Sequence, residues 1–199
     1  MTGRFEGDVI VKFLEDGRIA ELQNDLIFID PAGVRWGAPK GAQVDGASIP
    51  KGFWSLIGGP FEGKYRDASI IHDWFCDQRT RTWQATHRVF YDGMIARGVD
   101  PLKAKLMYYA VRWGGPRWEA RVSHNTKLDV GDDFKFGVDT QDGASAPRRP
   151  RTLPSPGRTL PQDAQEDVAQ RMQAFIEANA DVPLDALEGL AEQESPPAP

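Results

Sequence analysis

The chain has 199 residues, a net charge of −5 at pH 7, six tryptophans and one cysteine. A single cysteine excludes an intrachain disulfide framework. The sequence also lacks a run of 18 apolar residues that would span a membrane. The N-terminal MTGRFEGDVIVKF has no signal-peptide pattern, so we expect the protein to start in the cytoplasm.

Charge and aromatic residues are distributed unevenly along the chain. Residues 1–139 carry 19 Lys/Arg, 19 Asp/Glu and all six tryptophans, whereas residues 140–199 carry 5 Lys/Arg and 10 Asp/Glu. We therefore predict a globular domain over residues 1–139 and a Pro/Arg-rich linker over residues 140–161. Short amphipathic helices and a disordered end are expected over residues 162–199. The neutral charge of the globular part argues against a nucleic-acid partner.

The N-terminal part reads as β-structure. Alternating apolar residues predict strands at residues 5–14 and 19–29, and a short third strand at residues 34–36. A small three-stranded antiparallel sheet is the natural arrangement. After a glycine-rich loop, Ser48 is expected to cap a short helix that carries Pro50 in its first turn.

Helical periodicity begins after this loop. Apolar stripes predict helices at residues 64–78, 83–97 and 101–113, with Thr82 as the N-cap of the second. The fold class is therefore α+β, with the sheet packed on about three helices. The stripes farther along, in the tail, are too short to be stable alone, so their apolar faces need the core or another chain.

Two of the three histidines lie on the apolar faces of the first two long helices. His72 shares its face with Phe75, and His87 shares its face with Phe90. A short turn between the helices makes them antiparallel, so we expect the two imidazoles to approach each other. Core packing and chemistry are both open as interpretations of the pair.

Two site chemistries follow from this pair. In the first, His72 is a general base, Asp73 binds a cation or orients a loop, and His87 supports the imidazole; these three are the candidate catalytic residues. In the second, Asp45, His72, Asp73 and His87 hold a divalent metal, zinc or calcium. Cys76 follows His72 by four residues and can share its ligand face.

A third chemistry, Ser48 as a nucleophile served by His72, has the least support. Ser48 lacks the G-x-S-x-G context of a nucleophile elbow, and local capping explains it. We expect Arg112, Arg117 and Arg121 to form a solvated face.

The motifs of this region resemble a family of small uncharacterised proteins of tailed phages and prophages. The matching blocks are DGASIP at residues 45–50 followed by Trp54, ASIIHDW at residues 68–74, and MYYAVR at residues 107–112. The resemblance implies a phage or prophage origin and no established activity. In that family an acidic residue precedes R-x-F, where this chain has His87.

The His-Asp pair also resembles, locally and weakly, the catalytic helix of phospholipase A2 enzymes. That resemblance implies His72 as the base, Asp73 as a calcium ligand and His87 in the supporting position. The glycine-rich calcium loop and the disulfides of those enzymes have no counterpart in this sequence, so the likeness is one of helix geometry.

Two functions are expected on this basis. One is a phage- or prophage-encoded hydrolase of a cell-envelope component that uses the His-Asp site, with or without a divalent metal. The alternative is a non-enzymatic virion or tail-assembly component whose C-terminal helices dock on a phage structural protein. Either product starts in the cytoplasm, and the second becomes associated with the virion.

Overall fold

The computed structural model describes residues 2–15, 17, 19–46, 49–58, 63–119 and 160–196. The strands are β1 (Arg4–Glu6), β2 (Val11–Phe13), β3 (Ala20–Leu22), β4 (Leu26–Ile29), β5 (Arg35–Ala38) and β6 (Gln43–Val44). The helices are η1 (Lys51–Phe53), α1 (Trp54–Ile57), η2 (Gly63–Tyr65), α2 (Arg66–Gln78), α3 (Trp83–Ala96), α4 (Pro101–Gly114), α5 (Gln162–Ala178) and α6 (Leu184–Glu194). The predicted α+β class is confirmed.

The N-terminal strands form two small antiparallel sheets where one was predicted. Their strand orders are β1-β4-β5 and β2-β3-β6. Arg4 lies opposite Ile29 in the first sheet, and Phe13 lies opposite Ala20 in the second. The pair β1-β4 and the pair β2-β3 therefore have the same register. The two pairs are consecutive parts of one long hairpin, one part in each sheet.

The side chain of Asn24 interrupts that hairpin. Its Oδ1 accepts a hydrogen bond from the Ile10 backbone N–H at 3.2 Å, and its Nδ2 donates to the Asp8 carbonyl at 2.7 Å. Gly7, at φ 82°, lets the chain leave the extended conformation beside this point. Hydrogen bonds of the Asn24 side chain thus replace backbone hydrogen bonds of the sheet at this point, and each predicted long strand is split into two shorter ones.

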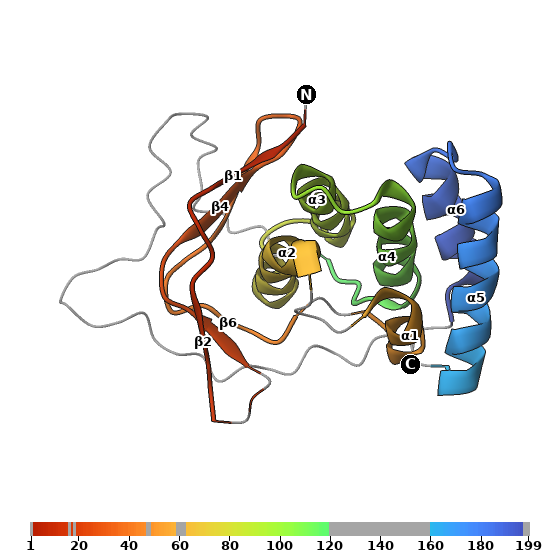
Figure 1. Cartoon of the computed structure of the whole chain (residues 1–199), viewed down its shortest axis with the longest axis horizontal. Helices are drawn as coiled ribbons and strands as arrows, with labels where there is room; N and C mark the ends of the chain where they lie inside the picture. Colours follow the sequence, from red (N-terminus) through yellow and green to blue (C-terminus); the bar gives the residue numbers. More distant parts are fainter. Residues whose placement is uncertain are drawn as a thin grey trace.

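The elements are stacked in layers, with α2 near the middle (Figure 1). The sheets lie on one side of α2, α3 and α4 follow on the other, and α5 and α6 form the outer layer (Figure 1). One buried cluster joins the sheets to α2 through Ile70, Ile71 and Phe75. A second cluster joins the helices, so α2 contributes to both cores.

The ends of the long helices follow local rules. Thr82 Oγ1 accepts the Ala85 N–H at 3.2 Å, which confirms the predicted cap of α3. Asp100 caps α4 in the same way, with Pro101 in the first turn. The short helix expected to carry Pro50 in its first turn begins one residue later, with Pro50 as the N-cap, as the 3-10 turn η1 followed by the four-residue α1. Ser48 lies outside the described residues.

The C-terminal helices pack on the chain's own core. The apolar residues Val168, Ala169, Met172, Ile176, Leu187 and Ala191 are buried in the cluster that includes α4. Three bonds from α4 to α6 strengthen the contact: Tyr108 to Glu188 at 2.6 Å, Tyr109 to Glu194 at 2.9 Å and Arg112 to Glu192 at 2.7 Å. The tail therefore covers a face of α4 that would otherwise be exposed.

The prediction that Arg112 is solvated is wrong. Its side chain is only 2% exposed, and its guanidinium lies 4.6 Å from the centre of the Trp83 ring. Arg117 stacks on the same ring at 4.7 Å, and its Nη2 donates to the Arg112 carbonyl. Aromatic and anionic partners in other elements allow Arg112 to be buried and Arg117 to be half-buried. Arg121 and most of the predicted linker lie outside the described residues.

Among the described residues, none of the helices has the length and apolarity that a membrane crossing requires.

Candidate functional site

His72 of α2 and His87 of α3 meet between the two helices. His72 Nε2 lies 2.8 Å from His87 Nδ1, and the ring centres are 5.0 Å apart. Both side chains are 0% exposed. The short connection from Arg79 to Thr82 reverses the chain, so the apolar faces of α2 and α3 are brought together as the sequence predicts. At this separation one nitrogen donates and the other accepts, as in a neutral hydrogen-bonded pair.

Aromatic rings enclose the pair. Phe90 lies 5.0 Å from the His72 ring. Trp83 and Trp118 meet the His87 ring edge-on at 5.5 and 6.2 Å. A Cβ added to Gly115 would lie 3.3 Å from His87 Cε1, so a residue without a side chain lets the chain pass close over the ring after α4. These contacts separate the imidazoles from solvent.

Burial keeps both histidines neutral at pH 7. It lowers the pKa of His72 to about 3. Burial also lowers the pKa of His87 well below its usual value, and the nearby His72, Arg112 and Arg117 lower it further. The Pro116 backbone acts in the opposite direction. Among the described residues, His87 Nε2 has no hydrogen-bond partner of ordinary geometry.

Cys76 completes the cluster from the next turn of α2. Its Sγ lies 3.6 Å from His72 Nε2 and 3.8 Å from His72 Nδ1. Burial raises the pKa of the thiol, with a further increase from Asp73 and a smaller one from Asp77. Donor atoms of His72, Cys76 and His87 all lie within 4.8 Å of one another, and all three residues are buried. This set contains the ligand types of a transition-metal site.

Asp73 and Asp45 are placed together, but away from this set. Asp73 Oδ2 accepts the Asp45 backbone N–H at 2.7 Å, and Asp73 is 1% exposed. Consecutive residues of a helix point about 100° apart, so Asp73 faces the loop after β6 while His72 faces α3. Of the two roles predicted for Asp73, this bond corresponds to orienting a loop. Within the described residues, neither aspartate joins the group that could hold a metal.

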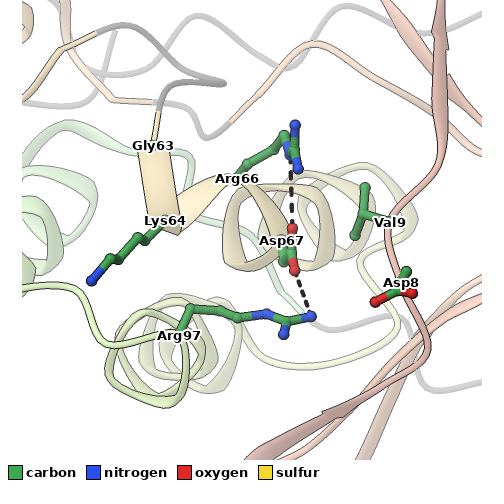
Figure 2. A pocket seen from close by; sticks show the side chains of 7 residues that line it. All are labelled: Asp8, Val9, Gly63, Lys64, Arg66, Asp67 and Arg97. Carbon is green, nitrogen blue, oxygen red and sulfur yellow. Dashed lines mark ion pairs between the residues drawn. The ribbon is translucent and has the colours of Figure 1, made fainter.

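Two surface hollows lie elsewhere. One, of about 270 Å³, is bordered by Lys64, Arg66, Asp67 and Arg97 (Figure 2). Asp67 occupies its centre and pairs with Arg97 at 2.6 Å and Arg66 at 3.8 Å (Figure 2). The other, of about 190 Å³, lies between α1, α4 and α5. Neither is lined by a histidine.

The sequence did not predict which residues complete the histidine cluster and shield it from solvent. Cys76 was placed on the ligand face of His72 by its spacing, but it was not among the four metal candidates. Trp83 precedes His87 by four residues, and this spacing signals a contact. Trp118 and Gly115 follow α4 and reach His87 only through the tertiary fold, so their roles have no local signal.

Residues 20–111, from β3 into α4, match the model of a family described as "Protein of unknown function (DUF1353)". Two uncharacterised proteins of Sinorhizobium fredii (strain NBRC 101917 / NGR234) are similar to part of the chain. One, y4jT, is 58% identical over 98 residues, which is 49% of this chain and 29% of that protein. The other, y4iH, is 50% identical over 97 residues, 49% of this chain and 41% of that protein. The matches thus span less than half of either relative, and no solved structure gives a significant match. A domain of this uncharacterised family is therefore present at residues 20–111, which include His72, Cys76 and His87.

Proposed function

We propose that this chain is a non-enzymatic component that is incorporated into a phage or prophage particle. The observation that carries the proposal is the complete enclosure of the candidate catalytic pair, His72 and His87. A general base must reach the proton that it removes and needs a pKa near the working pH. His72 is sealed by aromatic rings and has a pKa of about 3, so packing explains the pair better than proton transfer does.

The edge of β2 supports a role in binding another protein. Ile10 and Phe13 are 57% and 50% exposed, more than the other large apolar side chains among the described residues. Among the described residues β2 is an outer strand of its sheet, whose order is β2-β3-β6. The outer strand of a sheet can accept a further strand from a partner. Because α5 and α6 bury their apolar faces in the chain's own core, the proposed contact with a phage structural protein is this edge.

The test uses a phage or prophage that produces the protein. Ile10→Lys and Phe13→Lys together should remove the protein from purified particles, as measured by mass spectrometry. Val34→Lys is the matched control, since Val34 is also an exposed apolar residue but lies outside β2. If the folded double variant enters particles as well as the control does, or if the unaltered protein never enters them, the proposal fails.

A hydrolase of a cell-envelope component is the second candidate. The observation that favours it is the composition of the buried cluster, because two histidines and one cysteine leave a position open on a tetrahedral metal. This function requires an opening that brings substrate to His72. Wild-type protein should then release soluble products from envelope preparations, and His72→Gln should abolish the release. Equal release by the two proteins would exclude this candidate.

A further inference from the structure

We propose that His72, Cys76 and His87 bind one zinc ion, through His72 Nε2, Cys76 Sγ and His87 Nδ1. The proposal goes beyond the assembly function, because a buried metal that joins two helices is compatible with a protein that catalyses nothing. It assigns a ligand to a set of groups that hydrophobic packing alone does not explain.

Two of the three separations between donor atoms are close to the edges of a tetrahedron around zinc, and all three lie within 4.8 Å. Zinc bonds to nitrogen of about 2.0 Å and to sulfur of about 2.3 Å put two nitrogens about 3.3 Å apart, and a nitrogen and a sulfur about 3.5 Å apart. His72 Nε2 and Cys76 Sγ are 3.6 Å apart. His72 Nε2 and His87 Nδ1 are 2.8 Å apart, so these two nitrogens must move apart by about 0.5 Å to bind the same ion.

The chemistry of the donors selects the kind of metal. A thiolate and two imidazoles suit zinc and other borderline ions, whereas calcium takes oxygen ligands. The oxygen donors that were candidates, Asp45 and Asp73, lie outside this group in the described part of the chain. Of the two ions considered from the sequence, the cluster therefore fits zinc and not calcium. Three protein ligands leave the fourth position for water or another small ligand.

The placement of the three residues gives the ion a mechanical role. His72 and Cys76 are one turn apart on α2, so both donors point to the same side of the helix. His87 supplies the third donor from α3, and one ion would tie the two central helices together. His87 then carries its proton on Nε2, the buried nitrogen that has no partner of ordinary geometry among the described residues. Metal-bound histidines usually donate this second N–H to a carbonyl or carboxylate. The Pro116 carbonyl is the acceptor near the ring, since proline has no N–H to offer.

Cobalt titration of the full chain tests the proposal. The purified protein is stripped with a chelator, titrated with Co²⁺ and followed by its absorption spectrum. We expect one Co²⁺ per chain, an intense thiolate-to-cobalt band, and loss of both the band and the cobalt when one equivalent of Zn²⁺ is added. Absence of stoichiometric binding, or binding without a thiolate band, overturns the proposal.

Two variants connect the signal to the site. Cys76→Ser keeps the shape of the side chain and should abolish the thiolate band and weaken Zn²⁺ binding at least a hundredfold. Ser69→Ala is the matched control, because Ser69 is buried on the same face of α2, one turn before His72, and lies outside the donor group. It should bind as the unaltered chain does. Near-UV circular dichroism of each stripped variant verifies the fold, and equal Zn²⁺ affinity of folded Cys76→Ser and wild type would contradict the assignment.

Discussion

Acid should destabilise the metal-free protein through His72 and His87. Both histidines are neutral in the folded chain, because burial lowers the pKa of each. In the unfolded chain they take up protons as the pH falls below their usual pKa of 6.5. Protons therefore bind the unfolded state preferentially. The stability contributed by the neutral pair is complete above about pH 6.5 and is lost as the pH falls from there toward the folded-state pKa, about 3 for His72.

The size of the effect follows from these pKa values. Between pH 7 and pH 5, protonation of one unfolded histidine favours unfolding by about 2 kcal/mol. In the folded state His72 is fully buried and its pKa is about 3. It therefore takes up almost no proton at pH 5, and protonation of the folded state offsets almost none of this free energy. His87, whose pKa burial also lowers well below its usual value, adds to this loss, so the pair costs more than about 2 kcal/mol at pH 5. That is a large share of the stability of a typical domain, about 5–15 kcal/mol.

Urea unfolding at pH 7 and pH 5, with a chelator present, measures this loss. The control is the double variant His72→Gln/His87→Gln, which keeps polar groups at both positions but cannot take up a proton. Carboxylates titrate in both proteins, so their contribution cancels in the comparison. Wild type should lose over about 2 kcal/mol more than the double variant, and each single variant should recover part of the difference. Equal losses in all four proteins would refute the claim that both imidazoles are sealed and neutral in the fold.

Three substitutions test the surroundings of the site by denaturant unfolding at pH 7. Leu187→Ala should lower the free energy of unfolding by about 2–5 kcal/mol, because Leu187 is 1% exposed in the core beside α4. Phe175→Ala, at an exposed position of α5, is the control and should lower it far less. Similar losses in the two variants would mean that α6 does not belong to the core. Thr82→Ala should cost about 1 kcal/mol, since it removes the acceptor of the Ala85 N–H at the start of α3, and an unchanged midpoint would argue against the cap. Ser69→Ala should leave the stability unchanged or raise it, because the buried hydroxyl of Ser69 has no hydrogen-bond partner in the described structure. A loss of stability above about 1 kcal/mol would mean that the hydroxyl does form a hydrogen bond in the folded protein.

The sequence was most informative where the determinants are local. Helical periodicity and caps such as Thr82 located α2, α3 and α4 to within a few residues, because 3.6-residue spacing and cap chemistry depend on neighbours in the chain. The approach of His72 and His87 followed from the same information. A short turn leaves two amphipathic helices few ways to pack other than side by side, and each histidine lies on the apolar face.

Features that depend on distant residues were not predictable. The hairpin divides because Asn24 bonds to the backbone of Asp8 and Ile10, and strand propensity contains no signal for this. Arg112 was expected in solvent because isolated arginines usually are exposed. Its burial depends on Trp83 and on Glu192, which lies eighty residues away.

The packing of the C-terminal helices α5 and α6 also depends on distant residues. Its apolar stripes predicted helices correctly, and left open whether the core or another chain covers them. In the fold, the acidic residues of α6 meet Tyr108, Tyr109 and Arg112 on α4. Pairs that are so far apart in sequence can be recognised only after the intervening helices are placed. Consequently α5 and α6 stabilise the domain itself.

The central claim is that His72, Cys76 and His87 converge on one enclosed metal-binding point. X-ray absorption at the zinc edge of the full chain, loaded with one equivalent of Zn²⁺, measures that directly. The account predicts one sulfur at about 2.3 Å and nitrogen or oxygen neighbours at about 2.0 Å, with imidazole scattering from two rings. A coordination shell of oxygen and nitrogen alone, without sulfur, would contradict it.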